Sequence, residues 1–463
     1  MIVLDVNLED EMKKKLMGLK RTVMFVMTLL ILLGTTLSFY YMWDKNFSES
    51  IIRPFYKNGN ILIVMLYAVI VFAFTKIYSG YRIGYLKLSE VIYSQVLSLL
   101  FVNIITYIQI SLIGRRFLSL IPMIKMTVVQ IIIICIWAFL TNKLYFYIYP
   151  PRKTLFIFGE EDPNFMINKF NKHKEKFNIS SKISINIGVE EVVKKLNDFE
   201  AIILYGIDVK SRERILEVCY ERSLRVYVVP TPQDVIINNS DTLHLIDTPM
   251  LLLRNRGLSA ENRFAKRAID IILSSIALLI LSPIMLIVAA LIKLYDRGPA
   301  LFKQKRLTTD GKTFDVYKFR SMIVDAEKDG VARLASKNDN RITPIGKFIR
   351  AVRLDELPQL LNILKGDMSI VGPRPERPEI AEEYMKTMPE FKYRLKVKAG
   401  LTGYAQILGK YNTTPRDKLL LDMMYIEKYS LFLDFKLMLM TVKILFMSES
   451  TEGVEEGNIL PNE

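Results

Sequence analysis

The sequence predicts a membrane protein in three parts: four transmembrane helices, a Rossmann-like α/β module and a mainly α-helical C-terminal domain. Hydrophobic residues make up 51% of the 463 residues, and the mean hydropathy of +0.22 is high for a wholly water-soluble chain. Charged residues nevertheless make up 24%, so part of the chain must face water. Long apolar runs occupy the N-terminal third, and alternating strand and helix patterns follow them.

The N-terminal region, residues 1–150, contains four apolar runs at about 22–43, 60–79, 91–113 and 120–141. Each is close to the roughly 20 residues that a helix needs to cross a bilayer. The first run is too long for the apolar part of a signal peptide and lacks a small-residue cleavage site, so we expect it to remain as a spanning helix. Lys20 and Arg21 precede it and predict a cytoplasmic N-terminus, although Arg115 and Arg116 then lie in an outer loop, against the positive-inside rule.

Residues 151–255 read as a parallel α/β module, with strands expected at 154–159, 183–187, 201–206 and 225–230. Helices are expected between them, at 189–196 and 211–222. The first strand runs into Gly159-Glu160-Glu161-Asp162-Pro163, where a dinucleotide-binding protein would have Gly-x-Gly-x-x-Gly. Acidic side chains repel a pyrophosphate, and proline lacks a backbone donor. We therefore expect a scaffold or regulatory module, with a cofactor-binding domain as the alternative.

A further apolar stretch, 268–292, is interrupted near its middle by Ser282 and Pro283. Proline removes one helical hydrogen bond and clashes with the preceding turn, so the helix should bend there. Basic residues flank both ends, such as Arg267 and Lys293, and basic flanks prefer the cytoplasm. These features predict a re-entrant helix that enters the membrane, breaks and returns. An ordinary kinked fifth span is the alternative.

The formal charge of +15 favours anionic lipids or phosphorylated substrates. No helix-turn-helix or zinc-finger spacing is present, so nucleic acid is not an expected partner. Cys135 and Cys219 lie in an apolar run and a water-facing segment, which argues against a disulfide. His173 and His244 both precede the C-terminal third. Chemistry in that third must therefore use carboxylates, Lys, Arg or Tyr.

Three segments of the C-terminal region combine charge with a constrained backbone. Lys318 and Arg320 end a strand-like run, where they are either functional cations or solvated charges. Asp355 has the position of a helix N-cap and Glu356 that of the first turn, and capping by itself would explain the pair.

Nearby arginines favour a second interpretation of this acidic pair. Arg350 and Arg353 would keep Asp355 ionised, and an ionised aspartate is a competent nucleophile towards phosphorus. Pro373 and Pro375 would hold Arg374 rigidly, and a guanidinium suits phosphate oxygens. A plain surface turn is the alternative for that segment. The amphipathic stretches 345–352 and 357–364 face either the headgroup layer or the core.

At these residues the chain resembles the bacterial sugar transferases, the polyprenyl-phosphate hexose-1-phosphate transferases (monotopic phosphoglycosyl transferases). The resemblance runs from about Asn262 to Leu445 and rests on several motifs in order. They are the Ser-Pro-broken helix, Lys-Phe-Arg-Ser-Met, Leu-Asp-Glu-Leu-Pro-Gln-Leu, Lys-Gly-Asp-Met-Ser, Gly-Pro-Arg-Pro and Gly-Leu-Thr-Gly-Tyr-Ala-Gln. Each motif is weak alone, but the ordered set is strong.

The resemblance implies a long-form member whose catalytic domain is 262–450, followed by a tail at 451–463. Asp355 matches the nucleophile and the expected ligand of Mg²⁺, and Glu356 matches its partner in the dyad. Phosphate or substrate binding is assigned to Lys318, Arg320, Arg350, Arg374 and Gln406. Structural roles are assigned to Ser282, Pro283, Pro373 and Pro375.

The implied reaction moves hexose-1-phosphate from a UDP-hexose to undecaprenyl phosphate, through an aspartyl-phosphosugar, with release of UMP. It would begin capsule, exopolysaccharide or O-antigen synthesis at the cytoplasmic face of the bacterial membrane. Membrane lipids and a second copy of the chain are further expected partners. Glucose or galactose is the expected sugar. Ala399, Tyr404 and the segment 408–410 depart from the family pattern, which bears on sugar or nucleotide selectivity.

Two other classes of function compete with this one. A nucleotide-sugar dehydratase or epimerase would need a glycine-rich first turn and a Tyr-x-x-x-Lys pair, and neither occurs within 154–300. A non-enzymatic assembly scaffold would use only the helices and the α/β module.

Overall fold

The computed structural model describes residues 18–48, 55, 57–171, 176–253, 257–324, 339, 341–409 and 413–445. The expected tail at 451–463 and the departure at Lys410 lie outside these residues. The chain divides into two compact units, Met1–Val229 and Pro230–Glu463. This division falls inside the range 151–255 that the sequence assigned to the α/β module.

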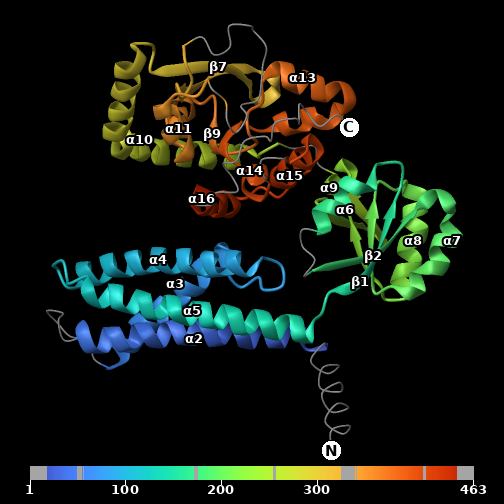
Figure 1. Ribbon diagram of the computed structural model, residues 1–463, viewed down its shortest axis with the longest axis horizontal. Coiled ribbons are helices and arrows are strands. Elements are labelled where there is room, and N and C mark those ends of the chain that lie inside the picture. Colours follow the sequence, from blue (N-terminus) through green and yellow to red (C-terminus); the bar gives the residue numbers. More distant parts are fainter. Residues whose placement is uncertain are drawn as a thin grey trace, which may run out of the picture. The chain divides into compact units, whose positions relative to one another are not determined.

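The described part of the first unit begins with four long apolar helices, each of which matches one predicted run (Figure 1). They are α2 (Lys20–Asn46), α3 (Lys57–Ile77), α4 (Leu88–Ile113) and α5 (Ile121–Ile148). All four are long and apolar enough to cross a membrane, and α10 (Ala260–Asp296) of the second unit is a fifth such helix among the described residues. Many of their large side chains are exposed, as a lipid-facing bundle requires.

A buried hydrogen-bond network ties the four helices together. The Tyr67 hydroxyl donates to Asn103 Oδ1 at 2.9 Å, and Asn103 Nδ2 donates to Gln130 Oε1 at 3.0 Å and to Thr127 Oγ1 at 2.8 Å. Gln130 Nε2 then donates to the Thr35 carbonyl at 3.0 Å. Polar groups in an apolar bundle are costly unless they are paired, so this network fixes which faces of the helices meet.

The first unit also contains a four-stranded parallel sheet of order β2-β1-β3-β4. Its core is apolar on both faces, as in other parallel sheets, and the centre of β1 is fully buried. The strands are β1 (Arg152–Phe158), β2 (Phe177–Ser184), β3 (Ala201–Tyr205) and β4 (Arg225–Val228). The helices between them are α6 (Pro163–Asn171), α7 (Val189–Lys195) and α8 (Val209–Glu221).

The strand predicted at 183–187 was placed too late in the sequence. Strand β2 ends at Ser184, and Ile185–Ile187 form a 3₁₀ turn. The Ser184 side chain accepts a hydrogen bond from the backbone N–H of Asn186, which caps this turn. The apolar residues that suggested a strand therefore belong partly to a turn, and Ile185 packs in the sheet core.

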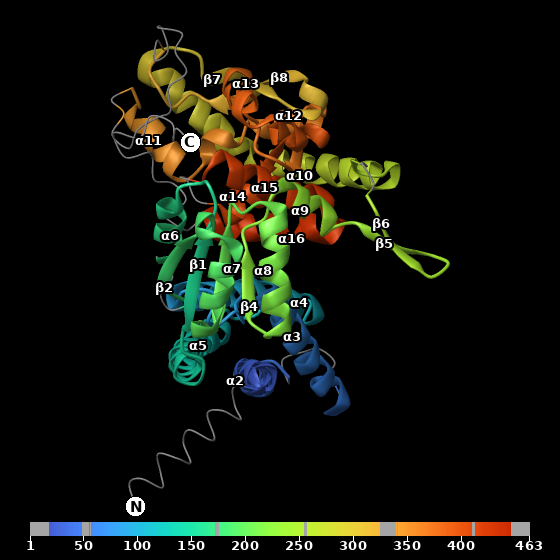
Figure 2. The same cartoon turned by 90° about the vertical axis from the view of Figure 1, so that its right-hand side faces the viewer.

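The described part of the second unit is mainly helical (Figure 2) and contains three two-stranded sheets. β5 and β6 form an antiparallel hairpin, β7 and β8 a second one, and β9 and β10 pair in parallel. The strands are β5 (Asp241–Leu245), β6 (Thr248–Leu252), β7 (Leu301–Leu307), β8 (Thr313–Phe319), β9 (Ser369–Val371) and β10 (Gly400–Thr402). The helices are α9 (Pro232–Ile237), α10 (Ala260–Asp296), α11 (Pro344–Ala351), α12 (Gln359–Lys365), α13 (Pro378–Thr387), α14 (Tyr404–Leu408), α15 (Pro415–Glu427) and α16 (Leu431–Leu445).

Helix α10 is one continuous helix that extends beyond the predicted 268–292 at both ends and contains Pro283. Its two halves run in clearly different directions in Figure 1. Pro283 cannot donate to the Leu279 carbonyl, and the Ser282 hydroxyl donates to that carbonyl instead, at 3.0 Å. The Ser-Pro pair therefore bends the helix without leaving this acceptor unpaired. That both ends face the cytoplasm stays a prediction.

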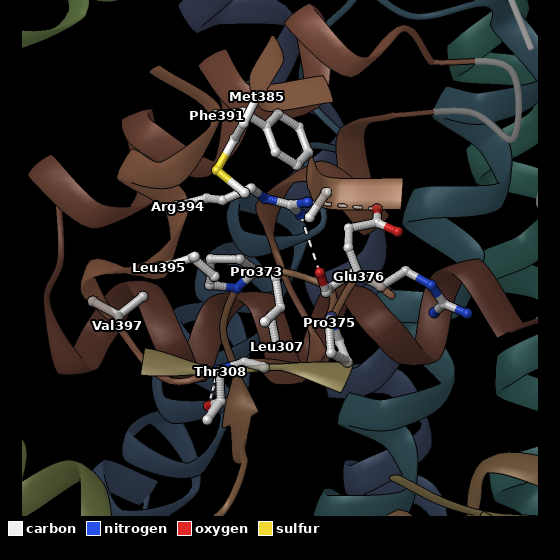
Figure 3. Close-up of a pocket in the computed structure, with 13 residues that line it drawn as sticks. Leu307, Thr308, Pro373, Pro375, Glu376, Met385, Phe391, Arg394, Leu395 and Val397 are labelled. Atoms are coloured by element: carbon white, nitrogen blue, oxygen red, sulfur yellow. Dashed lines mark hydrogen bonds and ion pairs between the residues drawn. The ribbon is translucent and has the colours of Figure 1, made fainter. Parts of the chain in front are cut away.

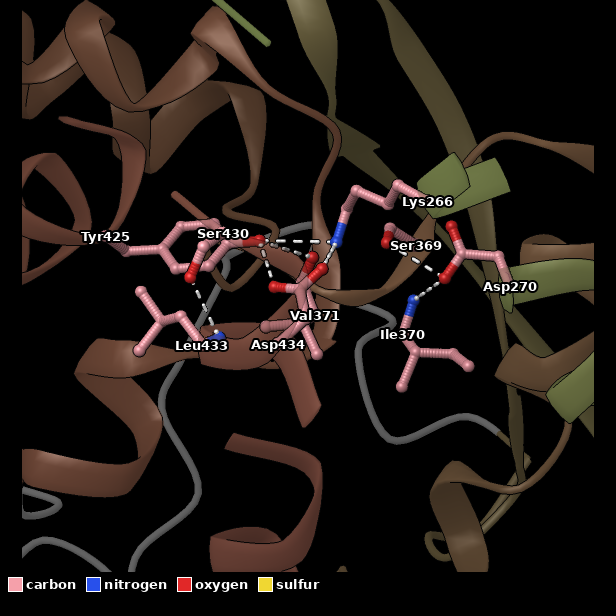
Figure 4. Close-up of polar contacts among 9 residues, drawn as sticks. All are labelled: Lys266, Asp270, Ser369, Ile370, Val371, Tyr425, Ser430, Leu433 and Asp434. Atoms are coloured by element: carbon pink, nitrogen blue, oxygen red, sulfur yellow. Dashed lines mark hydrogen bonds and ion pairs between the residues drawn. The ribbon is translucent and has the colours of Figure 1, made fainter. Parts of the chain in front are cut away.

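Buried polar contacts fasten the first half of α10 to the rest of the second unit (Figure 4). Lys266 Nζ lies 2.5 Å from Asp434 Oδ2 of α16 and donates to the Tyr425 hydroxyl at 3.2 Å. Asp270 Oδ1 accepts from the Ser369 hydroxyl at 3.1 Å and from the backbone N–H of Ile370 at 2.9 Å. These contacts join α10 to α15, α16 and β9, so the apolar helix has a fixed place beside the candidate site.

Candidate active site

One buried side-chain amide joins helix α12 to strand β8, and these two elements support the candidate site. Asn362 is fully buried; its Nδ2 donates to the Asp315 carbonyl at 2.8 Å, and its Oδ1 accepts from the backbone N–H of Tyr317 at 2.9 Å. Arg267 of α10 donates to the carbonyls of Ile363 and Leu364 at the end of α12. Lys318, the next residue of β8, is thereby held close to the segment that precedes α12.

The Asp-Glu pair lies on a short 3₁₀ turn, Leu354–Glu356, between α11 and α12. Arg353 enters this turn with φ of +56°, a left-handed conformation that is unusual for a residue with a Cβ. The prediction that Asp355 caps a helix was wrong, because the residue at the N-cap of α12 is Pro358 and no side chain caps that helix. The tight turn, rather than capping, accounts for the placement of the two carboxylates.

Glu356 is the anchored member of the pair. Its Oε1 accepts from Lys318 Nζ at 2.9 Å and from Arg374 Nη2 at 3.1 Å. Burial would raise the pKa of Glu356, but Lys318 and Arg374 outweigh it and hold that pKa well below the ordinary range. Glu356 is therefore a fixed anion with two cationic partners.

Asp355 is the less constrained member. It is half-buried, and no described residue donates a hydrogen bond to its carboxylate or forms an ion pair with it. Burial raises the pKa of Asp355, the charge of Glu356 raises it further, and Lys318 and Arg350 offset only part of this. Burial therefore outweighs the nearby arginines in setting this pKa, and the described cations that contact the dyad contact Glu356. That Asp355 is ionised when it reacts stays a prediction.

Arg350 and Arg374 approach the dyad from different elements. Arg350 is half-buried in the last turn of α11, and its charge acts on Asp355. It has no ion pair or side-chain hydrogen bond with any described residue. Arg374 has nearly half of its side chain exposed while it contacts Glu356. Both guanidinium groups therefore retain donors for an anionic ligand.

The loop that carries Arg374 is held by two other arginines, of which Arg394 is buried and Arg306 half-buried. Arg394 Nη2 donates to the Arg374 carbonyl at 3.1 Å, and Arg306 Nη1 donates to the Pro375 carbonyl at 3.1 Å. Arg394 also contacts Asp422 Oδ2, at 2.7 Å, and only 3% of its side chain is exposed. Proline fixes φ on both sides of Arg374, and the two guanidinium groups fix the carbonyls, so the side chain projects from a rigid backbone.

A small pocket lies behind this loop, lined by Leu307, Pro373, Met385 and Phe391 beside the Arg394 guanidinium (Figure 3). Its polar groups are already engaged with one another. Arg374 is among its lining residues, but neither Asp355 nor Glu356 is. We therefore interpret it as a packing feature of the loop and not as the reaction site.

Glycines allow the same loop to cross strand β10 at very short range. A Cβ on Gly372 would lie 2.3 Å from the Lys398 carbonyl oxygen, and one on Gly400 would lie 2.1 Å from the Gly372 nitrogen. A Cβ on Gly403 would lie 2.1 Å from the Gly372 carbonyl oxygen. The close approach leaves no room for a side chain at any of these positions. The glycine of the Gly-Pro-Arg-Pro motif and those of the Gly-Leu-Thr-Gly-Tyr-Ala-Gln motif therefore both permit this packing.

Two residues that the sequence assigned to substrate binding have intramolecular partners. Arg320 is buried and pairs with Asp296 at the end of α10, and its Nη1 presses against Gly298. Gln406 Nε2 donates to the Leu401 carbonyl at 3.0 Å. The contact of Arg320 fixes the end of α10, and that of Gln406 fixes the loop before α14. The other three predicted cations, Lys318, Arg350 and Arg374, lie near the dyad.

The predicted Mg²⁺ has one suitable protein ligand at this position, the carboxylate of Asp355. No group of three or more His, Cys, Asp or Glu side chains able to hold a metal occurs in the described part of the chain. Magnesium is commonly held by one or two carboxylates together with substrate phosphates, so a dedicated cage is not required. The half-buried carboxylate without a cationic contact fits such an ion.

Sequence reasoning missed the residues that support the site from behind. They are Arg306 and Arg394, which fall in unremarkable strand and helical patterns, and nothing local marks them as partners of the loop that carries Arg374. One local signal was Glu376, an acidic residue directly after Pro375, because a carboxylate at that position would need a cationic partner from elsewhere in the chain. That partner is Arg394, whose Nη1 lies 3.5 Å from Glu376 Oε1.

Comparison with known proteins identifies this unit. The Bacterial sugar transferase family model matches residues 261–448. A UDP-glucose:undecaprenyl-phosphate glucose-1-phosphate transferase of Klebsiella pneumoniae is 36% identical over 267 residues, 57% of this chain and 57% of the relative. A protein of the same name from Caulobacter vibrioides is 38% identical over 190 residues, 40% of this chain and 71% of the relative.

A galactosyl transferase of Streptococcus agalactiae is 43% identical over 194 residues, 40% of this chain and 42% of the relative. The chain thus covers about half the length of the Klebsiella and Streptococcus proteins, and more than two thirds of the Caulobacter protein. The chain belongs to the bacterial sugar transferase family.

Proposed function

We propose that the protein transfers hexose-1-phosphate from a UDP-hexose to undecaprenyl phosphate, with release of UMP, at the cytoplasmic face of the bacterial membrane. Family membership and the names of the relatives support this reaction class. The observation that carries the assignment to a site is the dyad: no cation of the described residues contacts Asp355, while its neighbour Glu356 is fixed by two. The product would begin a capsule, exopolysaccharide or O-antigen unit.

The reaction proceeds in two displacements at the sugar-bearing phosphorus. An Asp355 carboxylate oxygen attacks that phosphorus, and the bond to the bridging oxygen breaks, so UMP leaves with the bonding electrons. A phosphate oxygen of the lipid then attacks the same phosphorus. The aspartyl–phosphorus bond breaks, the carboxylate is regenerated, and undecaprenyl-diphospho-hexose leaves. Splitting the transfer in this way is typical of nucleophilic catalysis by a carboxylate.

The neighbouring charges suit each part of this scheme. A carboxylate with a raised pKa is a stronger nucleophile once ionised, and the fixed charge of Glu356 supplies part of that rise. Arg350 and Arg374 would bind phosphate oxygens and stabilise charge that develops there. Bound Mg²⁺, held by Asp355 and phosphate oxygens, would supply further neutralisation of the substrate charge.

Release of UMP from UDP-glucose or UDP-galactose tests the reaction. The protein in membranes should release UMP continuously only when polyprenyl phosphate is present. Without the lipid, it should release at most one UMP per chain and gain the mass of one hexose phosphate. Asp355→Asn should abolish both signals, whereas Asp315→Asn, an exposed carboxylate on the same strand as Lys318, should leave both intact. Near-normal turnover by Asp355→Asn would disprove the assignment of the nucleophile.

A further inference from the structure

The topology of the first unit brings one end of the helix bundle to the N-terminal ends of the sheet strands. Only residues 149–151 separate the end of α5 from Arg152, the first residue of β1. Lys20, the first residue of α2, reaches the same end and donates from Nζ to the Tyr145 hydroxyl at 2.5 Å. The turn between α3 and α4 also lies there, because a Cβ on Gly84 would lie 2.1 Å from the Tyr145 ring.

Five cations from five segments converge at this junction. The charges of Arg152 and Arg225 act on Lys20, and those of Lys20 and Arg82 act on Lys176. The strand register agrees, because Arg152 pairs with Phe177, the neighbour of Lys176. We refer to these residues as the junction cluster: Lys20, Arg82, Arg152, Lys176 and Arg225.

The junction cluster has no counterion among the described residues. None of its five members forms an ion pair with a carboxylate there, and none has a further unstated contact. Lys20 instead lies over the Tyr145 ring, 4.6 Å from its centroid, and Lys176 lies over the Tyr85 ring at 4.5 Å. Burial and the charges of Lys20 and Arg82 lower the pKa of Lys176, as expected where cations crowd without an anion.

We propose that the junction cluster binds a phosphate group. Like charges held close together repel one another, and an anion with several acceptor oxygens relieves that repulsion while using their N–H donors. Phosphate has both properties, and arginine and lysine are the residues that bind it. Basic residues beside a spanning helix are common on the cytoplasmic side, but that rule does not account for Lys176, which directly precedes β2, or for Arg225, the first residue of β4.

The phosphate has two possible sources, which the same chemistry serves: the headgroup of an anionic phospholipid or a soluble phosphate compound. The test uses the full chain in nanodiscs. In the soluble arm the discs contain only phosphatidylcholine, and inorganic phosphate is compared with chloride at equal ionic strength by its effect on the thermal unfolding midpoint. In the lipid arm the discs contain phosphatidylglycerol as well, and native mass spectrometry counts the phosphatidylglycerol that remains bound.

The comparison is between two variants of equal charge. The first is Arg152→Gln with Lys176→Gln and Arg225→Gln, and the second is Lys194→Gln with Lys195→Gln and Lys210→Gln on exposed helices of the same unit. In at least one arm, we expect the second variant to show the same shift in unfolding midpoint, or the same number of bound phosphatidylglycerol molecules, as the wild-type protein. The first variant should lose that response. Phosphate bound at the candidate active site would appear equally in both variants, so it does not affect the comparison.

A response in the soluble arm alone identifies a soluble phosphate compound as the ligand, and a response in the lipid arm alone identifies a phospholipid headgroup. A response in both arms shows that the junction cluster accepts phosphate from either source. The proposal is overturned if the wild-type protein responds in neither arm, or if the two variants respond alike. Should the triple variant at the junction fail to fold, the single changes Arg152→Gln and Arg225→Gln, both at exposed positions, provide the same comparison. None of these residues belongs to the candidate active site, so UMP release remains an independent measurement.

Discussion

Arg394 donates a hydrogen bond from Nη2 to the backbone carbonyl of Arg374, at 3.1 Å, while the same guanidinium is paired with Asp422. One buried cation thus sets the position of the loop whose side chain contacts the dyad. This relationship makes the site sensitive to residues that lie outside it.

Replacing Arg394 should therefore separate stability from positioning. Arg394→Ala leaves Asp422 buried without its partner, and breaking a buried pair of this kind costs about 3–5 kcal/mol. Arg394→Lys keeps a charge beside Asp422 but cannot also hold the Arg374 carbonyl, so it should fold with a smaller loss and show a reduced kcat/KM for UMP release. Unfolding midpoints and initial rates measure the two effects. Lys386→Ala, an exposed ion-pair residue of the same unit, should change neither.

The dependence of activity on pH should report the Asp355 carboxylate. Burial and Glu356 raise its pKa, and only the ionised form attacks, so kcat/KM should fall as pH falls through that raised pKa. Glu356→Gln removes the repelling charge and should move this acid limb to lower pH, while the maximal rate drops because Lys318 and Arg374 lose their anionic partner. Rates across a pH series at fixed Mg²⁺ would show the shift. An unmoved or upward-shifted limb would contradict the electrostatic account.

Gly372 should not tolerate even one added carbon. A Cβ there would lie 2.3 Å from a backbone oxygen, which cannot rotate away as a side chain can. We expect Gly372→Ala to displace the loop that carries Arg374 and to reduce UMP release strongly in protein that still reaches the membrane. Gly18→Ala is the control, since nothing lies within 4 Å of its added Cβ. Full activity of Gly372→Ala would show that the loop is more adaptable than its packing suggests.

The bend in α10 predicts where its two ends lie. In a chain with Cys135→Ser and Cys219→Ser, single cysteines at Glu261 and Leu294, near the two ends of α10, should react with an impermeant thiol reagent from the same side of the membrane. Pro283→Ala restores the backbone donor to Leu279 and should favour a straighter helix, so that the two cysteines become accessible from opposite sides. If the unmodified helix already showed opposite-sided labelling, it would be a kinked span.

The sequence alone determined the features that depend on local pattern. Four apolar runs form four helices, the alternation after residue 151 forms a parallel sheet, and Ser282-Pro283 lies inside the long helix α10. Periodicity, run length and proline chemistry act within a few residues, so a single sequence contains them. The catalytic family was also visible, because its motifs are short and continuous.

Only the tertiary structure decided which charges meet. It assigned Lys318 and Arg374 to Glu356, left Asp355 without a cationic contact from the residues that the structure describes, and paired Arg320 with Asp296. The reason is physical: ion pairing and burial depend on distances between segments far apart in the sequence, and a charge carries no local sign of its partner. Desolvation likewise reversed the expected effect on the Asp355 pKa, because it depends on everything packed around the carboxylate.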